Sequence, residues 1–171
     1  VDTAHGHSKG VIETVKLLEG YADVYLPDLK YKSPELSQKY SGCSDYFQQA
    51  SGAIAEMVRQ TGKPEFNNDE GIMTRGVIVR HLVLPGYTED SKEIISYLFH
   101  TFGDMIYISI MNQYTPLENV ARFPELNRRL TGDEYEEVVD HALTLGVENG
   151  FIQEGEAASE SFIPDFDGYG I

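Results

Sequence analysis

Apolar residues recur along this chain with two different spacings. In one, they stand three and four positions apart, which is typical of helices that bury one face. In the other, they form nearly continuous runs bounded by turn residues, which is typical of strands covered on both faces. The helical spacing predicts helices over 11–19, 33–40, 45–60, 89–102 and 131–145. The apolar runs predict strands over 22–27, 76–84 and 105–111.

Two of the predicted helices begin with recognisable capping residues. Ser33 precedes Pro34, which matches an N-cap followed by proline at the first helical position. Thr131 and Glu134 have the spacing of a capping box, and Gly146 stands where a glycine commonly ends a helix. Local chemistry therefore predicts these helix boundaries.

The order of the predicted elements alternates strand and helix, which is the signature of parallel α/β architecture. Three strand–helix units are few for an independent sheet, and the chain starts near what we interpret as a strand's end. We therefore expect a partial, truncated (β/α) barrel of the TIM-like kind over 1–148; the resemblance described below implies that it is the C-terminal half. The Glu-, Gly-, Ala- and Ser-rich residues 149–171 are expected to form an extended C-terminal arm.

Charge and composition narrow the function further. The 171 residues carry 13 basic and 28 acidic side chains, a formal charge of −15, which disfavours nucleic acid and anionic lipid as partners. No apolar run approaches the roughly 20 residues of a membrane span, and the N-terminus does not resemble a signal peptide. We expect a cytoplasmic protein without a membrane partner. The single cysteine, Cys43, excludes an internal disulfide and a multi-cysteine metal site within this chain.

Polar residues that end parallel strands are the natural candidates for chemistry, because reactive groups in such folds collect at the carboxyl ends of strands. Asp28 and Lys30 close one predicted strand, two residues apart, so both side chains should point to the same face. There they can bind a zwitterionic ligand or a cation. The spacing is equally compatible with a solvated ion pair, and that alternative stays open.

Other polar residues have simpler interpretations. His5 and His7 have a spacing that metals use, but two histidines near a chain terminus are more often incidental. His81 lies among apolar residues of a strand and is expected to be a hydrogen-bonded core histidine. Cys43 is expected to be inert, and Arg128-Arg129 to lie on a solvated surface. Neither a Walker pattern nor GxGxxG occurs.

An ordered series of short motifs covers nearly the whole chain. The motifs are Tyr25-Leu-Pro-Asp-Leu-Lys-Tyr31, Tyr40-Ser-Gly42, Arg80-His-Leu-Val-Leu-Pro-Gly86, Met111-Asn-Gln-Tyr-Thr-Pro116, Glu125-Leu-Asn-Arg-Arg129 and Phe151-Ile-Gln153. This series resembles the second half of pyruvate formate-lyase activating enzymes, which are radical S-adenosylmethionine enzymes of the glycyl-radical-enzyme-activating family. It is more similar still to the uncharacterised iron–sulfur branch of that family.

The resemblance implies a (β/α)6 partial barrel that holds a 4Fe–4S cluster on three cysteines of a CxxxCxxC loop. The cluster binds and cleaves S-adenosylmethionine to a 5′-deoxyadenosyl radical, which abstracts hydrogen from a glycine of a partner glycyl-radical enzyme. The protein contributes positioning and electrostatics to this oxidoreductase chemistry, whereas the cofactor carries the difficult step.

Carried over position by position, the resemblance makes Lys30 a contact of S-adenosylmethionine. Asp28 and Arg80 join it as cofactor-binding candidates. Gln113 and Tyr114 stand where the family presents another cofactor contact, although the family's histidine is absent here.

The same resemblance implies a monovalent-cation site formed by Asp2, Thr3 and Asp28. The chain departs from the family in lacking CxxxCxxC, and Cys43 alone cannot anchor a cluster. The glycine-rich cofactor loop after the second strand of the barrel is missing too. We therefore expect this chain alone to bind neither cluster nor S-adenosylmethionine and to be inactive.

Two hypotheses of different class follow. In the first, this chain is half of a full-length radical S-adenosylmethionine enzyme. In the second, it is a natural half-barrel that has lost its chemistry and acts as a binding or assembly module. In either case an open barrel edge predicts self-association, with a homodimer as the simplest form. A third, weaker hypothesis is an unrelated parallel α/β enzyme whose acidic surface binds a basic partner.

Overall fold

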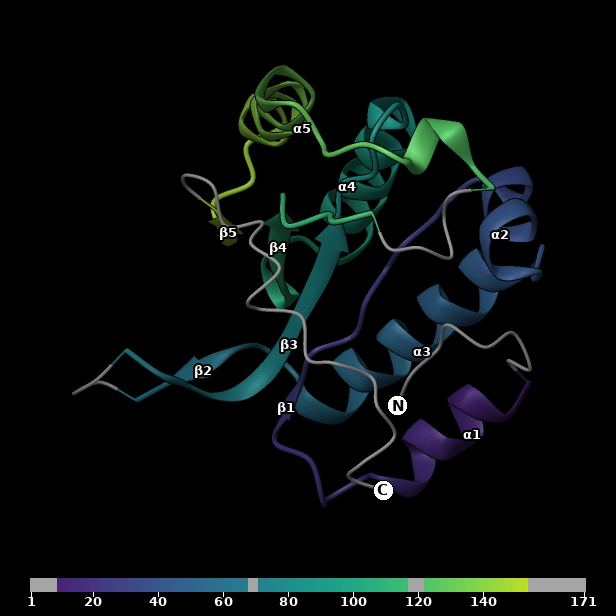
Figure 1. Ribbon diagram of the computed structural model, residues 1–171. Coiled ribbons are helices and arrows are strands. Elements are labelled where there is room, and N and C mark those ends of the chain that lie inside the picture. The colour runs from purple at the N-terminus through teal and green to yellow at the C-terminus, as the bar shows by residue number, and fades with distance from the viewer. Residues whose placement is uncertain (1–8, 68–70, 117–121, 154–171) are drawn as a thin grey trace, which may run out of the picture.

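The computed structural model describes residues 9–67, 71–116 and 122–153, and these form an α/β fold with a parallel sheet flanked by helices (Figure 1). The helices are α1 Lys9–Leu17, α2 Pro34–Ser41, α3 Tyr46–Thr61, α4 Thr88–Phe102 and α5 Gly132–Leu145, with short 3-10 helices η1 Gly103–Met105 and η3 Pro124–Leu126. The strands are β1 Val24–Tyr25, β2 Glu65–Phe66, β3 Met73–Leu82, β4 Tyr107–Met111 and β5 Gly150–Ile152.

Four strands lie in the order β1-β3-β4-β5, and every neighbouring pair in this order is parallel. The short strand β2 pairs antiparallel with the beginning of β3. Strand order thus follows chain order, and α3, α4 and α5 lie in the connections between successive parallel strands. The parallel architecture predicted from the alternating pattern is confirmed.

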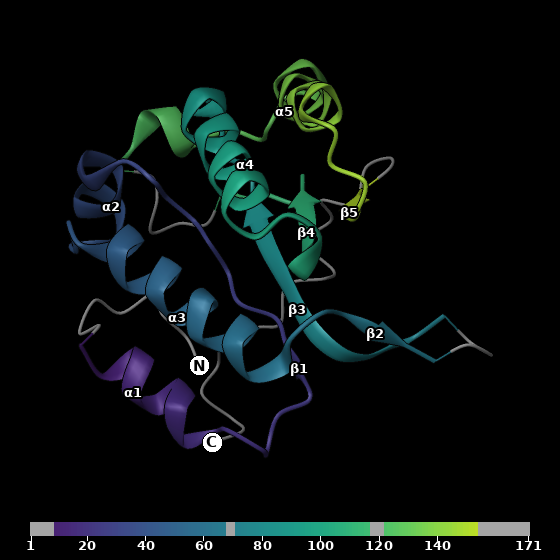
Figure 2. The same cartoon turned by 180° about the vertical axis from the view of Figure 1, so that it is seen from behind.

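Among the described residues, helices cover one face of the sheet, and the other face, which no described helix covers, is called the open face below. Figures 1 and 2 show α3 and α4 on one side of β3, with α1 outside α3, whereas no described helix lies on the opposite side. Burial follows the same division, because the buried positions of β3 and β4 alternate with partly exposed ones. The buried positions on the covered face are Val77, Val79, His81, Val83, Ile106, Ile108 and Ile110.

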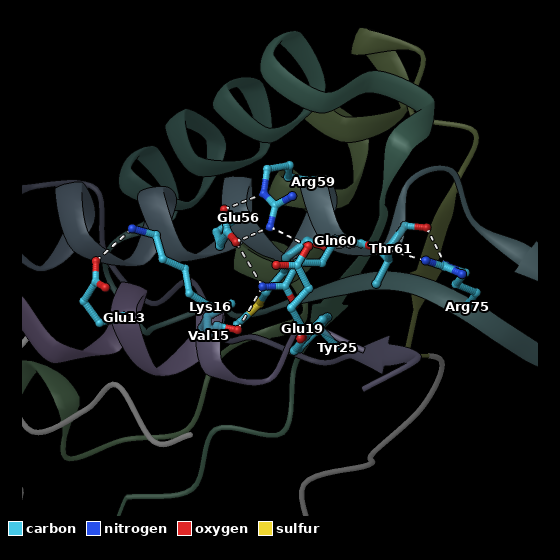
Figure 3. A network of polar contacts seen from close by, with 11 residues as sticks. Glu13, Val15, Lys16, Glu19, Tyr25, Glu56, Arg59, Gln60, Thr61 and Arg75 are labelled. Atoms are coloured by element: carbon cyan, nitrogen blue, oxygen red, sulfur yellow. Dashed lines mark hydrogen bonds and ion pairs between the residues drawn. The ribbon is translucent and has the colours of Figure 1, made fainter. Parts of the chain in front are cut away.

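Helix α1 is fastened to the rest of the fold by the polar network drawn in Figure 3. The amide Nε2 of Gln60 donates to the carbonyl oxygen of Val15 at 2.9 Å, and the hydroxyl of Tyr25 donates to Oε1 of the same Gln60 at 2.5 Å. Arg59 bridges Glu19 and Glu56 with its Nη2 at 2.9 and 2.8 Å. One turn of α3 therefore joins α1 to β1.

The predicted helix caps are confirmed. The hydroxyl of Ser33 accepts a hydrogen bond from the backbone N–H of Leu36, and Thr131 and Glu134 form the capping box. Gly42 and Gly146 end α2 and α5 with positive φ angles of 67° and 86°, which glycine adopts without steric cost.

The sheet differs from the prediction at both edges. Only Val24 and Tyr25 of the predicted strand 22–27 are paired as β1, and Asp28 makes one further isolated bridge to Arg80. The beginning of the predicted C-terminal arm, Gly150–Ile152, is the fourth parallel strand, β5. The rest of the arm, 154–171, lies outside the described residues. No helix in the described ranges is both long and apolar enough to cross a bilayer.

Candidate functional site

Asp28, Arg80 and Ser109 lie side by side across three neighbouring segments of the sheet. Asp28 is paired in register with Arg80, and Arg80 is paired with Ser109. Side chains at paired positions of a parallel sheet point to the same face. Arg80 lies on the partly exposed set of β3 positions, so the three side chains share the open face near the carboxyl ends of the strands.

Asp28 and Arg80 form an ion pair on this face. The Nε of Arg80 donates to Oδ1 of Asp28 at 2.8 Å, and the two side chains are 43% and 33% exposed. Oδ2 of Asp28 makes no hydrogen bond to the described residues. Among the described residues, Oδ1 of Asp28 is therefore occupied by the guanidinium and Oδ2 has no partner.

Lys30 shares the face of Asp28. Leu29 and Tyr31 are buried, whereas Asp28 and Lys30 are partly exposed, so burial alternates along this segment as the two-residue spacing predicts. Within the described part of the chain, the ammonium of Lys30 makes no ion pair. A partly desolvated ammonium without an internal counter-charge is suited to bind a ligand carboxylate.

The backbone around Leu29 is held from several sides. The N–H of Leu29 donates to the carbonyl of Arg80 at 2.9 Å, and its carbonyl lies 2.7 Å from Nδ1 of His81. The hydroxyl of Tyr46 accepts from the N–H of Lys30 at 3.0 Å and donates to the carbonyl of Asp28 at 3.1 Å. This segment is therefore fixed although it lies beyond the regular pairing of β1.

His81 points away from the open face and into the core. It is 1% exposed, which confirms the prediction of a hydrogen-bonded core histidine. Because the partner of Nδ1 is a carbonyl oxygen, Nδ1 carries the proton and donates it to Leu29. Burial lowers the pKa of His81 below its ordinary value, and the bond to Leu29 and the negative charge of Asp90 oppose that shift only in part.

Gln153 closes the carboxyl edge at β5; the sequence analysis placed it in the motif Phe151-Ile-Gln153 but assigned it no role in the site. Its Oε1 accepts from the N–H of Asn112 at 3.0 Å, and its own N–H donates to the hydroxyl of Tyr135 at 2.8 Å. The same Tyr135 hydroxyl donates to the carbonyl of Ile110 at 2.8 Å. The sequence signal for Gln153 was this short motif, which lies in a segment interpreted as an arm.

The two candidates that follow β4 are placed differently from each other. Gln113 is exposed, and its amide lies 3.8 Å from the sulfur of Met111. Tyr114 is buried, and its hydroxyl donates to the carbonyl of Leu126 at 2.9 Å. The structure thus leaves Gln113 open to a ligand, whereas the phenol of Tyr114 holds η3 in place and does not join the group around Asp28.

The loop that follows β3 is tied to the start of α5. Oε1 of Glu134 accepts from the N–H of Gly86 at 2.7 Å, and the guanidinium of Arg128 binds both oxygens of this carboxylate at 2.6 and 2.7 Å. This guanidinium holds the pKa of Glu134 at about 2. Arg128 is partly exposed, as predicted, but it is paired.

A second cluster joins α2 to the loop after β3 and to η3. The hydroxyl of Tyr40 donates to Oε1 of Glu125 at 2.7 Å and lies 2.6 Å from the hydroxyl of Tyr87. The ammonium of Lys39 also binds Glu125 and, with Tyr40, holds the pKa of that carboxyl at about 2. Together with Glu134, this cluster orders the loops that surround the carboxyl edge.

A hollow in the surface lies away from this site. A groove of about 570 Å³ runs over the outer face of α4, next to α5. Its charged side chains are largely paired, since Lys32 binds Glu93 at 2.8 Å and His141 Nε2 lies 2.8 Å from the hydroxyl of Ser96. None of the residues around it belongs to the open face of the sheet.

The motifs imply two cofactors, S-adenosylmethionine and a 4Fe–4S cluster. Lys30, whose ammonium makes no ion pair with the described residues, is of the right charge to bind the carboxylate of the first. The single cysteine does not fit a cluster, because Cys43 is 6% exposed and its thiol donates to Oδ1 of Asp45 at 2.9 Å. No cluster chemistry can therefore be assigned to residues of this chain.

Only one of the three residues predicted to form the cation site lies in the described part of the chain. Asp28 is described, whereas Asp2 and Thr3 lie outside the described residues, as do His5 and His7. Among residues 9–67, 71–116 and 122–153, no three His, Cys, Asp or Glu side chains are grouped to hold a metal ion.

Comparison with known proteins gives one relative of unknown function. An uncharacterised protein of Methanocaldococcus jannaschii, MJ0674, is 30% identical over 131 residues. These residues make up 77% of this chain and 34% of that protein, so the chain spans about a third of the length of this relative. No family model and no solved structure matches the chain.

Proposed function

We propose that this chain is the C-terminal half of a radical S-adenosylmethionine enzyme similar to pyruvate formate-lyase activating enzymes. The observation that carries the proposal is the convergence of Asp28, Lys30 and Arg80 on one open face at the carboxyl ends of parallel strands. These are the residues of the two most distinctive motifs, which are separated by 49 residues between Lys30 and Arg80 in the sequence.

The arrangement of the sheet supports a half-barrel in particular. Strand order follows chain order, and the helices of the described residues cover one face only. A doubly wound sheet places helices on both faces and reverses its strand order once. A barrel keeps one order and one covered face, because its other face is the interior. We therefore favour part of a (β/α)6 barrel.

In this proposal the residues of this chain bind and orient S-adenosylmethionine. Lys30 binds the carboxylate, the exposed Gln113 offers an amide at the neighbouring strand end, and the Asp28–Arg80 pair supplies an orienting carboxylate and guanidinium. The free oxygen of Asp28 would face a monovalent cation shared with Asp2 and Thr3. S-adenosylmethionine on a reduced 4Fe–4S cluster supplies a 5′-deoxyadenosyl radical, which would abstract hydrogen from a glycyl-radical enzyme; the ligands of that cluster must come from outside this chain.

The experiment that tests the proposal is to read the genomic coding sequence upstream of Val1. A CxxxCxxC motif in the preceding hundred or so residues, the length of three βα units at ~30 residues each, is the expected result. An initiation codon at or just before Val1 would contradict it and leave the binding module as the remaining function.

The alternative, a half-barrel that acts as an assembly module, is favoured by one observation. Within the described residues, β5 is the last strand of the sheet; there Phe151 and Ile152 are 46% and 50% exposed, and Leu26 beside β1 is 53% exposed. Unpaired edges with apolar side chains favour pairing with another chain. We propose that the isolated chain forms a homodimer through such an edge. Light scattering during size-exclusion chromatography tests this, and a monomer at all working concentrations would contradict it.

A further inference from the structure

Two tyrosines on different helices make the same bridge at the carboxyl edge of the sheet. Tyr46, the first residue of α3, accepts a hydrogen bond from the N–H of Lys30 at 3.0 Å and donates one to the carbonyl of Asp28 at 3.1 Å. Tyr135 of α5 accepts from the N–H of Gln153 at 2.8 Å and donates to the carbonyl of Ile110 at 2.8 Å. Each phenol uses both its donor and an acceptor lone pair.

We propose that Tyr46 is a positioning residue that holds Asp28 and Lys30 in their binding geometry, an inference that rests on the proposed function. The last regular pair of β1 is Tyr25 with Val77, and beyond it Asp28 makes only a single bridge. Leu29 directs its N–H and its carbonyl to β3, so the Asp28 carbonyl and the Lys30 N–H point away from that strand, and the Tyr46 hydroxyl supplies the donor and the acceptor that these two groups need.

The bridge spans the residue that the core already anchors. Leu29 is fully buried, its N–H donates to the carbonyl of Arg80, and its carbonyl accepts from His81. Tyr46 fixes the peptide groups on both sides of it. The backbone that carries Asp28 and Lys30 is thus held at successive positions from β3 and from α3.

The ring of Tyr46 is held as firmly as its hydroxyl. The side chain is 3% exposed, and its ring packs edge-on against Tyr31 with 5.5 Å between the ring centres. A phenylalanine would fill the same space without the hydroxyl. Since Lys30 makes no ion pair in the described structure, its ordering before a ligand arrives depends on its backbone, and preorganised groups bind more tightly than groups that must first be ordered.

Tyr46→Phe removes the bridge and leaves the packing. Amide hydrogen exchange measured by NMR on the 171-residue chain should show Lys30 exchanging about fivefold faster, because one hydrogen bond and the order it maintains are lost. Tyr135→Phe is the matched variant and should accelerate Gln153 while sparing Lys30. Tyr97→Phe, in a tyrosine whose ring packs against Phe47 and Phe102, should change neither amide.

The second readout is the affinity of the longer protein, with its cluster cysteines, for S-adenosylmethionine, measured by calorimetry without turnover. Tyr46→Phe should weaken binding about fivefold, and Tyr135→Phe should leave it unchanged at a similar loss of thermal stability. If both variants weaken the binding of S-adenosylmethionine equally, Tyr46 stabilises the fold and does not position Lys30. If the wild-type protein does not bind S-adenosylmethionine, the proposed function fails. Unchanged Lys30 exchange in Tyr46→Phe overturns the positioning role independently.

Discussion

Arg80 and Asp28 face each other in register on the open side of the sheet, with Nε of Arg80 2.8 Å from Oδ1 of Asp28. The two residues are 52 positions apart, with α2, α3 and β2 between them, so the contact exists only in the folded chain. Both side chains remain partly exposed, and exposed ion pairs contribute little to stability. The pair is therefore expected to contribute little to the stability of the fold.

The exposure of this ion pair predicts a small coupling between the two residues in the free energy of unfolding. In a double-mutant cycle with Asp28→Asn and Arg80→Gln, we expect a coupling energy below about 1 kcal/mol in the free energy of unfolding. Urea titrations followed by circular dichroism give the four free energies. A coupling of several kcal/mol would mean that the pair is a structural element of the sheet.

His81 predicts a specific dependence of stability on pH. Its pKa in the folded chain lies below the ordinary value of 6.5, so the unfolded chain binds the proton first as pH falls. The contribution of His81 is therefore complete above pH ~6.5 and is lost as pH falls from there towards the folded pKa.

The variant His81→Asn retains a donor near the carbonyl of Leu29 but does not titrate. We expect it to be less stable at neutral pH and to lose less free energy of unfolding between pH ~7.5 and pH ~5 than the wild type. The exposed His100 gives the control, since His100→Asn should leave the wild-type slope nearly unchanged. If His81→Asn keeps the wild-type slope of the free energy of unfolding against pH, His81 does not cause the pH dependence in this range.

Glu134 predicts a second dependence, at lower pH. Arg128 and the backbone groups of Thr131 and Gly86 lower its pKa from 4.5 to about 2. A carboxyl with a depressed folded pKa stabilises the fold above its unfolded pKa, and this contribution is lost as pH falls from about 4.5 to about 2.

Glu134→Gln should cost about 1 kcal/mol at neutral pH, because the capping box and the bond to Gly86 lose their charge. The difference from the wild type should close as pH approaches about 2, in urea titrations at a series of pH values. The exposed neighbour Glu136→Gln serves as the control. A difference that stays constant with pH would contradict the assigned role.

Gly76 marks the point where β3 changes partners, and it cannot carry a side chain without strain. Its φ angle is +139°, and a Cβ atom there would lie 3.1 Å from Cα of Pro64. Gly76→Ala should lower the free energy of unfolding by about 1–3 kcal/mol. Gly10→Ala, in α1 with nothing within 4 Å of the added atom, should be neutral or stabilising. Equal effects of the two changes in thermal unfolding would argue against this local geometry.

The helices were predictable because their signals are local. Ser33, Thr131 and Glu134 cap their helices through residues three positions away, and Gly146 ends α5. The long strand β3 was predictable because its apolar run indicates a buried strand even when the neighbouring strands are not known.

The short strands and the supports of the site were not predictable in this way. Strand β5 has three residues, and it is defined by pairing with β4 rather than by its own pattern. The tyrosine bridges join residues 16 to 25 positions apart. Asp28 and Lys30 could be proposed from spacing, whereas Tyr46 and Gln153 needed the packing of α3 and the register of the sheet.

The central claim is that Lys30 and its neighbours bind S-adenosylmethionine in a longer radical enzyme. The most direct test is to reconstitute that longer protein with iron and sulfide under anaerobic conditions, reduce it, and measure 5′-deoxyadenosine released from S-adenosylmethionine by chromatography. We predict release by the wild type and a strong loss in Lys30→Met. A fully reconstituted protein that leaves S-adenosylmethionine intact, or a Lys30→Met variant that cleaves it as fast as the wild type, would contradict the claim.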